Sequence, residues 1–415
     1  MPTDGALYVV HPRRRPLVLP EVTVYPRSGS GPQPGDIPLP DGLWLSSAER
    51  ALLDNLAPSP ASTPHRTLTR VELEAWLDRL LRQRGEEGLN LLRDNARAIA
   101  EPLRRRTQFR LLDGLVSAAL ATRSDVPLAS PQLRASSKGQ PYDTRRVEAF
   151  EELAETLLET PPDIMPDLPA YAGRRTLLPF YEAYFSNFIE GTEFTLDEAA
   201  DIVFDSNVPA SRPQDAHDVL GTYQIVVDPA EMATVPRTPD GLIELLRLRH
   251  ATLMSARPEK NPGAFKTRAN RAGATEFVAP DLVTRTLRAG FEAGKDLLDP
   301  FARAVFLMFL VAEVHPFDDG NGRISRIMMN AELASGGEIR IVIPIVYRAN
   351  YLAALKGATH NRNFGALIRT LAFARRYTAR VDFSSRETAE ADLVRTHALD
   401  DAREAEDAGA RLILP

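Results

Sequence analysis

Apolar positions recur at helical spacing along most of this chain, which predicts a mainly α-helical protein. Residues 68–85 are one example, with an apolar residue at every third or fourth position. From Arg145 to about Tyr377 the pattern is almost wholly helical. Within it, Asp299 and Pro300 form a good N-cap and first turn, and the 14 residues that follow are apolar nearly all round. We therefore expect a buried helix there.

Stretches rich in Pro, Gly and Ser divide the helical pattern into regions. The N-terminal stretch combines them with short alternating apolar runs, which predict small strands, and a single apolar helix capped near Ser46 or Ser47. A polar stretch at 126–142 predicts a linker. The predicted regions are a strand-bearing N-terminal region at 1–65, a helical N-terminal domain at 66–140, a large helical domain at 145–380 and a helical tail at 381–415.

The amino-acid composition indicates the cellular compartment and excludes some classes of chemistry. The 415 residues carry a net charge of −6 and no cysteine, which excludes disulfides and thiolate chemistry and fits a reducing compartment. The apolar runs are far shorter than the roughly 20 residues that cross a bilayer, and the N-terminus lacks the apolar core of a signal peptide. We expect a cytoplasmic protein with no membrane partner, and no basic block favours nucleic acid.

The segment 314–329, VHPFDDGNGRISRIMM, concentrates the groups that chemistry on a phosphate requires. His315 follows the buried helix, and a histidine is largely neutral at cytosolic pH, as a general base must be. Asp319 offers a carboxylate that could hold Mg²⁺ against phosphate oxygens. Taken alone, His315 would be a helix cap and Asp319 a turn former, so the assignment depends on their neighbours.

Those neighbours form a predicted anion site. Gly320, Asn321 and Gly322 allow the positive φ angles that turn successive backbone N–H groups toward one point. A helix beginning near Arg323 would direct its free N–H groups to the same point. Arg323 and Arg326 lie three residues apart and so share a face of that helix.

The run HPFDDGNGRISR matches the signature HPFx(D/E)GNGRxxR of Fic (filamentation induced by cAMP) domain proteins, also called Fido. This resemblance implies a Fic-type helical bundle with a small β-hairpin flap, preceded here by a smaller α/β or helical region. It also implies transfer of AMP from ATP to a Ser, Thr or Tyr hydroxyl of a target protein, with Mg²⁺ as cofactor. Gly322 stands where phosphotransferring relatives carry lysine, which favours nucleotidyl transfer.

The same resemblance assigns a role to each residue of the motif at 315–326. It implies that His315 is the catalytic base and that Asp319 holds the metal. It further implies that Gly320–Gly322 form the anion hole, and that Arg323 and Arg326 bind the β- and γ-phosphates.

A second motif lies upstream, on a helix expected at about 179–190. Ser186, Glu190 and Gly191 match (S/T)xxxE(G/N), the inhibitory-helix signature of Fic proteins, and the position N-terminal to the core resembles class II members. The resemblance implies that Glu190 pairs with Arg326 and so prevents it from orienting the γ-phosphate. We expect a pair shielded from solvent. Without the resemblance, the motif would be an interhelical turn with an exposed glutamate.

A strand pair is expected over 265–278, around a turn at Gly273. Residues 266–277 resemble the flap of Fic proteins, which docks an extended target segment by strand pairing. Lys266, Thr267 and Phe277 are the predicted docking residues. Further along, Tyr351 and Asn361 are candidate contacts to the adenine base, with core packing as the alternative.

The sequence leaves three hypotheses about the function open. The first is an adenylyltransferase restrained by Glu190, acting on a target protein or on itself. The second is an enzyme that removes AMP, with Glu190 positioning water. The third is a regulatory binding protein whose N-terminal region recruits DNA or a partner while the domain that carries the motif only senses ATP. The target, the donor nucleotide and the oligomeric state, including a homodimer, are undetermined, and no histidine pair has the spacing of a metal hydrolase.

Overall fold

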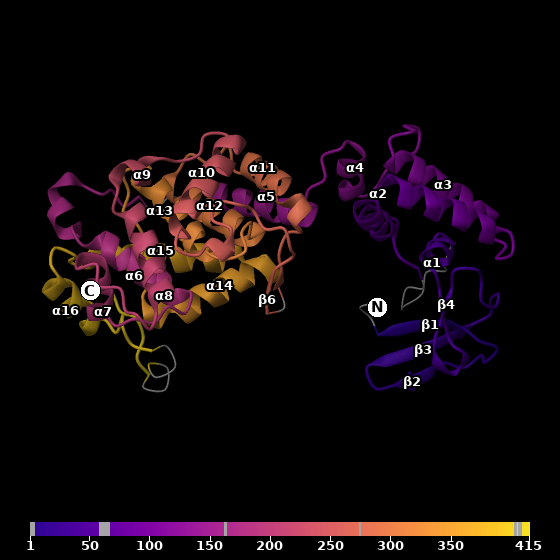
Figure 1. The fold of residues 1–415 in the computed structure, drawn as a ribbon, viewed down its shortest axis with the longest axis horizontal. Helices are drawn as coiled ribbons and strands as arrows, with labels where there is room; N and C mark the ends of the chain where they lie inside the picture. The colour runs from indigo at the N-terminus through magenta and orange to yellow at the C-terminus, as the bar shows by residue number, and fades with distance from the viewer. Residues whose placement is uncertain (1–4, 58–66, 162–163, 274, 402–404, 406–408) are drawn as a thin grey trace. The chain divides into compact units, whose positions relative to one another are not determined.

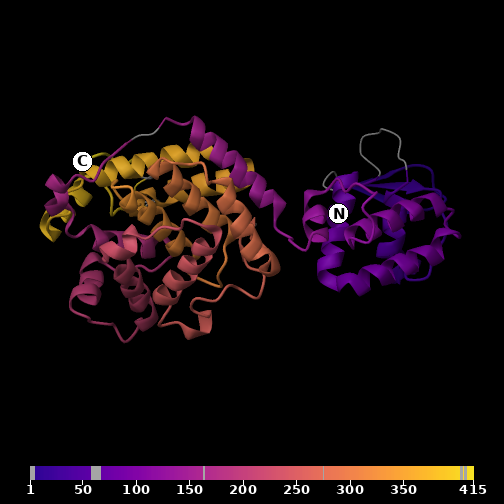
Figure 2. The ribbon, with the colours of Figure 1, turned by 90° about the horizontal axis from the view of Figure 1, so that it is seen from above.

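The computed structural model describes residues 5–57, 67–161, 164–273, 275–401, 405 and 409–415. The chain divides into two compact units, Met1–Tyr142 and Asp143–Pro415. Both units are visible in Figures 1 and 2. Most described residues are helical and the strands are few and short, so the predicted mainly α fold is confirmed.

The N-terminal unit combines strands and helices, as expected for an α/β region. Strand β3 pairs in parallel with β1 and antiparallel with β2, and β4 pairs antiparallel with β5. Its elements are β1 (Ala6–Val10), β2 (Leu17–Leu19), β3 (Val22–Arg27), β4 (Ile37–Pro38), β5 (Trp44–Leu45), α1 (Ala48–Asn55), α2 (Arg70–Ala100), α3 (Arg106–Ala119) and α4 (Pro131–Ser137), with a 3₁₀ turn at Pro40–Gly42.

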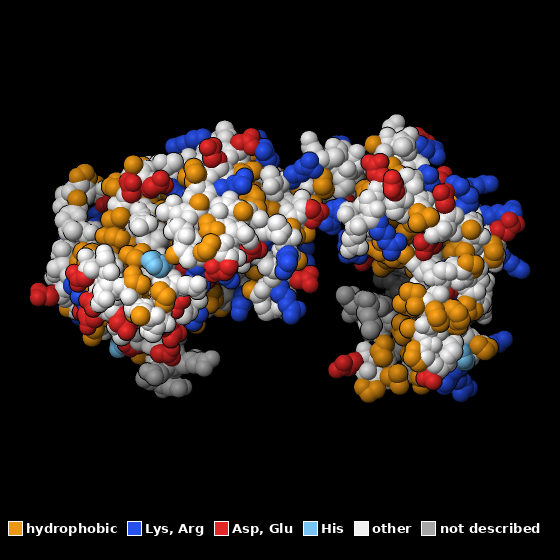
Figure 3. Space-filling model, viewed as in Figure 1, with side chains coloured by type: hydrophobic (Ala, Val, Ile, Leu, Met, Phe, Trp, Pro, Cys, Tyr) orange, Lys and Arg blue, Asp and Glu red, His pale blue; other side chains and the backbone are white. Residues whose placement is uncertain are grey.

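The helices of this unit enclose its core, whereas the strands leave apolar side chains in solvent. Buried leucines of α1, α2 and α3 pack together, among them Leu52, Leu77 and Leu115, each 0% exposed. Ser47 caps α1 by accepting a hydrogen bond from the backbone N–H of Arg50, which confirms one of the two predicted caps. Figure 3 shows apolar side chains gathered over the strands. Val18 of β2, for example, is 75% exposed.

The predicted linker at 126–142 is partly wrong, because the helix α4 lies inside it. Ser130 caps this helix and Pro131 opens it, while Leu133 is fully buried. The backbone N–H of Ser130 also donates to Glu74 of α2, with an N···O distance of 2.7 Å. A helix of seven residues is too short to produce a periodic apolar pattern, so the sequence pattern missed it.

Among its described residues the C-terminal unit is mainly helical, with one short hairpin and an isolated bridge between Pro166 and Glu338. Its helices are α5 (Thr144–Glu159), α6 (Leu178–Ile189), α7 (Leu196–Phe204), α8 (Pro213–Val226), α9 (Pro229–Ala233), α10 (Pro239–Leu253), α11 (Val283–Ala293), α12 (Pro300–Val314), α13 (Asn321–Ser335), α14 (Arg348–Asn361), α15 (Phe364–Arg380) and α16 (Arg386–Arg395). The hairpin is β6 (Arg271–Ala272) and β7 (Thr275–Glu276), and 3₁₀ turns occur at Pro169–Arg175, Pro258–Lys260, Pro280–Leu282 and Ile345–Tyr347.

Helices α12 and α13 pack against each other inside this unit, with the other helices around them (Figures 1 and 2). Asp299 caps α12 and Pro300 opens it, and the helix is buried on nearly every side, as predicted. The loop between α12 and α13 carries the HPFDDG segment. Because both flanking helices are fixed by packing, the loop is held by a rigid part of the fold.

Two predicted elements differ from those observed. The strand pair covers only Arg271–Ala272 and Thr275–Glu276. Beyond it, one backbone hydrogen bond joins Phe277 to Asn270, and the side chains of Lys266 and Asn270 hold the preceding chain. The expected tail at 381–415 contains α16, and part of the rest lies outside the described residues. Within the described part of the chain, no helix combines the length and the apolar character needed to cross a membrane.

Candidate active site

His315 ends α12 in a backbone conformation that few residues other than glycine adopt. Its φ is 52° and its ψ 60°, in the left-handed region, and its N–H donates to the carbonyl of Val311. The ring Nδ1 lies 3.3 Å from the carbonyl oxygen of Ala312, which can only accept, so Nδ1 carries the proton. Nε2 is therefore left as the basic nitrogen.

The ring of Phe277 covers the imidazole of His315. The two rings stack with centroids 3.7 Å apart and planes 6° from parallel. Burial lowers the pKa of His315 to about 4, and the nearby ammonium of Lys266 acts in the same direction. His315 is thus neutral at physiological pH, in the state that a general base requires.

His250 of α10 supports the loop that follows His315, and sequence reasoning missed it. Its Nδ1 accepts from the N–H of Gly263 (2.9 Å), and its Nε2 donates to the carbonyl of Asp319 (3.1 Å). The ring also stacks on Phe317, with centroids 3.7 Å apart. Burial lowers the pKa of His250 to about 4, which keeps this one neutral tautomer. A lone histidine on a helical face carries no sequence signal for such a role.

Asn321 closes the same loop from the start of α13. Its side chain accepts from the N–H of Phe317 (2.9 Å) and donates to the carbonyl of the same residue (2.9 Å). Asn270, just before β6, donates to that carbonyl as well (3.0 Å). The Asn321 side chain is therefore structural in this state, and Phe317 is fully buried, as expected for a loop anchor.

The N-terminus of α13 presents backbone N–H groups to an anion. Gly320 is its N-cap with a φ of 73°, and no side chain of the described residues caps this helix end. A Cβ placed on Gly322 would lie 2.1 Å from Oε1 of Glu190 and 2.9 Å from its Cδ. The carboxylate of Glu190 therefore lies directly over the predicted anion site, where a phosphate would bind.

Arg323 is buried and held by partners that the sequence pattern did not indicate. Its Nη1 lies 2.9 Å from Oδ2 of Asp218 on α8, and its Nη2 lies 3.7 Å from Asp319. Asp218 also binds the guanidinium of Arg257, which donates from Nε (2.9 Å) and Nη2 (2.7 Å). Because Asp218 and Arg257 are far from the motif in the sequence, only the tertiary structure identifies them.

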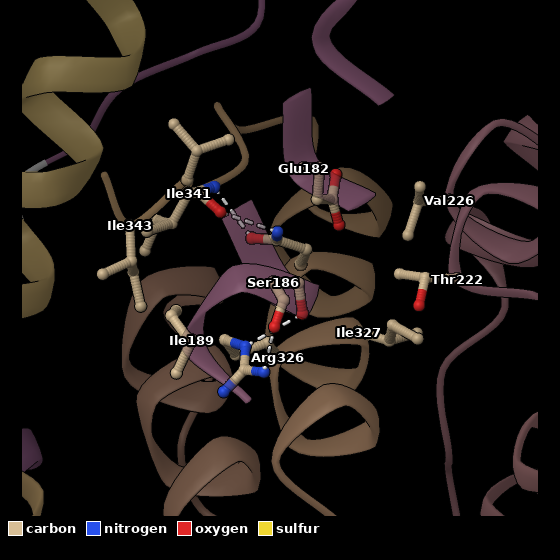
Figure 4. Close-up of a pocket in the computed structure, with 11 residues that line it drawn as sticks. Glu182, Ser186, Ile189, Thr222, Val226, Arg326, Ile327, Ile341 and Ile343 are labelled. Carbon is tan, nitrogen blue, oxygen red and sulfur yellow. Dashed lines mark hydrogen bonds between the residues drawn. The ribbon is translucent and has the colours of Figure 1, made fainter. Parts of the chain in front are cut away.

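Arg326 makes the predicted contact with Glu190. Its Nη2 donates to Oε1 of Glu190 (2.7 Å) and to the carbonyl of Ser186 (2.8 Å), and its Nε donates to Oγ of Ser186 (3.0 Å). Figure 4 shows the guanidinium directed at Ser186. The pair is shielded on one side only, since the Arg326 side chain is 7% exposed and that of Glu190 is 37% exposed. The expectation of a pair shielded from solvent is therefore confirmed for Arg326 and wrong for Glu190.

The end of α6 determines where Glu190 lies. Glu190 is the C-cap of this helix, and Gly191 follows with a φ of 92°, which a side chain would strain. Thr195 is the N-cap of α7 and forms a capping box with Glu198. Arg348 of α14 donates from Nε to the carbonyl of Ile189, the last residue of α6 (2.9 Å). The carboxylate is therefore presented from a turn that is fixed on both sides.

A cavity behind Arg326 is too small for a nucleotide. Its volume is about 10 Å³, which is room for roughly one water. Figure 4 shows it between α6 and α13, and it is lined by Glu182, Ser186, Ile189, Thr222, Val226, Arg326, Ile327, Asn330, Ile341, Val342 and Ile343.

The structure separates the three predicted docking residues of the flap. The Lys266 side chain lies beneath the flap, 3% exposed, with Nζ 2.6 Å from Oδ1 of Asn270. Phe277 covers His315, whereas Thr267 is exposed. Of the candidate base contacts, Tyr351 is 1% exposed, and its hydroxyl lies near Met308 and interacts with the guanidinium of Arg326.

Asp319 fits a metal that arrives with a nucleotide. Its side chain is 38% exposed, and Oδ2 lies 3.6 Å from Nζ of Lys260. Within the described residues no group of three or more acidic or histidine side chains could hold a metal without other ligands. A single carboxylate combined with phosphate oxygens and water is a common Mg²⁺ site, so the residue fits that use.

Comparison with known proteins connects this geometry to a family. Residues 242–333, which include His250 and the whole motif at 315–326, match the family model described as Fic/DOC. Residues of the chain are 30% identical over 128 residues to a protein adenylyltransferase, fic-1, of Caenorhabditis briggsae, covering 30% of this chain and 24% of that protein. They are 27% identical over 243 residues to protein adenylyltransferase Fic of Nematostella vectensis, covering 55% of this chain and 53% of that protein.

Solved structures of similar proteins are also found. Fic-1 (residues 134–508) of Caenorhabditis elegans is 17% identical, with a TM-score of 0.39 over 82% of this chain and 99% of that one. A Fic domain-containing signalling protein of Bacteroides thetaiotaomicron is 22% identical, with a TM-score of 0.40 over 58% of this chain and 99% of that one. The chain spans between a quarter and about half of the length of the curated relatives given above.

Proposed function

Because this chain contains a domain of the Fic/DOC family at residues 242–333, we propose that it is a protein adenylyltransferase restrained by Glu190. The substrates are ATP and a Ser, Thr or Tyr hydroxyl on a target protein. The observation that carries the proposal is one constellation: a neutral His315 beside an uncapped helix N-terminus, with an internal carboxylate over that N-terminus.

His315 supplies the base. Its Nε2 takes the proton of the target hydroxyl while the hydroxyl oxygen forms a bond to the α-phosphorus of ATP. The bond between the α-phosphorus and the bridging oxygen breaks, and pyrophosphate leaves with the electron pair. The hydrogen bond from Nδ1–H to the carbonyl of Ala312 orients the ring and favours the imidazolium that forms.

The phosphates would bind where the Glu190 carboxylate now lies. The N–H groups at the start of α13 supply fixed dipoles for the phosphate oxygens, and Arg323 and Arg326 supply charge. Asp319 is the residue that would hold Mg²⁺, which neutralises charge on the phosphates when bound. Glu190 competes for the same site in two ways, because it is an anion over Gly322 and it pairs with Arg326.

A labelling experiment tests the proposal. Glu190→Gly should raise protein labelling from α-labelled ATP by about tenfold or more, which corresponds to about 1.4 kcal/mol. His315→Ala in the Glu190→Gly background should abolish labelling. The mechanism is wrong if the double variant labels protein as fast as Glu190→Gly alone.

The relatives are named adenylyltransferases, which does not favour AMP removal or ATP sensing. Mass spectrometry of cell lysate incubated with Glu190→Gly and each nucleotide triphosphate would identify the donor, the target and the modified residue. The same spectra would reveal modification of the chain itself, and the oligomeric state is measured separately by light scattering.

A further inference from the structure

Arg146, which belongs to neither sequence motif, binds the flap. It lies in the first turn of α5, and its side chain is 11% exposed. Its Nη2 donates to the carbonyl of Glu276 in β7, with an N···O distance of 2.6 Å. Its Nε lies 2.7 Å from Oε1 of Glu313, a residue of α12 that is two positions before His315. One guanidinium thus contacts both the flap and the helix that carries the proposed base.

Glu313 is itself fixed, so Arg146 is held in one position. The Glu313 side chain is 4% exposed, and its Oε2 accepts from the hydroxyl of Thr359 on α14 (2.8 Å). A buried carboxylate requires a cation and hydrogen bonds to remain ionised at low cost. The planar guanidinium can satisfy this carboxylate and a carbonyl in another direction at once, which a lysine ammonium does less well.

The flap residue after Glu276 is Phe277, whose ring covers the imidazole of His315. The backbone of Phe277 is tied to the base of the flap, because its N–H donates to the carbonyl of Asn270 (3.2 Å). Thr275 on the other side of Glu276 bonds to His360 of α14 (2.9 Å). Arg146 therefore holds β7 next to the residue that contacts the proposed base, from the side of α5.

We propose that Arg146 is a positioning residue that fixes the flap strand over His315. The proposal rests on the proposed transferase function for its kinetic consequence, but not for its structural one. By holding the carbonyl of Glu276, Arg146 keeps Phe277 stacked on the imidazole. It also presents the flap in a fixed register to the target segment. Loss of this contact should slow transfer without weakening ATP binding, since Arg146 contacts none of the residues at the phosphate site.

Three variants separate positioning from simple loss of stability. Arg146→Lys keeps a cation for Glu313 but cannot also hold the carbonyl of Glu276 in the same geometry. Arg146→Gln combined with Glu313→Gln removes both charges, so no buried charge is left unpaired. Arg145→Gln is the matched control, because Arg145 is the neighbouring arginine and its side chain is exposed.

The first measurement is amide hydrogen exchange in the full chain. Exchange at 275–278 should become about tenfold faster in Arg146→Lys and in the double variant, while α12 exchanges as before. Arg145→Gln should exchange like the parent. Unchanged exchange at 275–278 in both Arg146 variants would overturn the proposal, whether or not the chain is a transferase.

The second measurement adds Glu190→Gly to each variant. Transfer from α-labelled ATP to the acceptor that Glu190→Gly labels should fall about ten- to a hundredfold in maximal rate, with the KM for ATP within twofold of the Glu190→Gly value. A maximal rate equal to that of Glu190→Gly, or a KM for ATP that rises in parallel with the loss, would overturn the proposal. If Glu190→Gly labels nothing, the proposed function fails and the exchange measurement still decides the role of Arg146.

Discussion

His250 and His315 are both buried in the candidate site, and burial lowers the pKa of each imidazole. His250 and His315 each have a pKa of about 4, with desolvation as the first cause. The neutral form of His250 is needed because Nδ1 accepts a hydrogen bond from Gly263. A proton on Nδ1 would oppose the N–H of Gly263 and weaken the support of the carbonyl of Asp319.

This arrangement predicts a pH-dependent stability. The folded pKa of His250 lies below the unfolded value of about 6.5, so its contribution is fully present above pH 6.5 and is lost as the pH falls toward 4. The shift corresponds to about 3 kcal/mol at most. Urea unfolding between pH 7 and pH 4.5 should show a shallower decline for His250→Gln than for the parent. His217→Gln, at an exposed histidine, should follow the parent, and identical slopes for His250→Gln and the parent would contradict the prediction.

The pKa of His315 predicts the pH–rate profile of the enzyme. In the Glu190→Gly variant, kcat/KM for labelling should stay high down to about pH 5 and fall only as His315 takes up a proton near pH 4. Circular dichroism at each pH gives the folded fraction, and the measured rates are corrected for it. A midpoint near 6.5 would show that His315 is not desolvated in the free enzyme.

At the scale of elements, the important relation is between the end of α6 and the start of α13. The C-cap of α6 places Glu190 over the N-terminus of α13, so one helix end supplies the anion and the other the site for it. The ion pair itself is partly exposed and contributes little by its charge alone, on the order of 1 kcal/mol. The inhibition therefore depends on how firmly the surrounding helices hold the last turn of α6.

A substitution at Arg348 tests whether inhibition depends on the last turn of α6. Arg348 donates to the carbonyl of Ile189 in that turn, and its hydrogen bond does not involve the Glu190 side chain. Arg348→Gln should raise basal labelling by about tenfold, toward the Glu190→Gly level, because a hydrogen bond from a charged donor contributes about 1.5–3 kcal/mol and a loss of about 1.4 kcal/mol already corresponds to tenfold. The change should have little effect once Glu190→Gly is present. Lys356→Gln, at an exposed position on the same helix, is the control. Equal effects of Arg348→Gln in both backgrounds would contradict the idea.

At the scale of the whole molecule, the chain consists of two units with separate cores. Buried leucines of α1, α2 and α3 form one core, and aromatic residues of α6 pack with α15 and α16 residues in another. Every residue assigned to the candidate site lies in the unit Asp143–Pro415. The division between the two units falls after Tyr142.

A fragment that begins at Asp143 should fold alone, because its core needs no residue of the N-terminal unit. We expect a single cooperative thermal transition for residues 143–415 and, with Glu190→Gly, labelling activity. The full chain serves as the reference. Loss of the cooperative transition in the fragment would show that the N-terminal unit is required for folding.

The sequence alone determined the helical class, the N-cap of α12 and the identity of the motif residues. These follow from local rules, because capping, helical periodicity and a contiguous loop motif involve residues that are neighbours in the chain. The contact between Glu190 and Arg326 was also predicted before the structure, but only from the resemblance to a family.

The tertiary structure decided which distant residues support the site. Asp218 reaches Arg323, His250 supports the loop, and Arg146 contacts the flap, each across a separation that no local pattern encodes. It also decided exposure, since Lys266 lies beneath the flap and Glu190 remains partly in solvent. Burial depends on how helices pack around a residue, so the pKa values and the shielding of charges follow from the fold and not from the residue types.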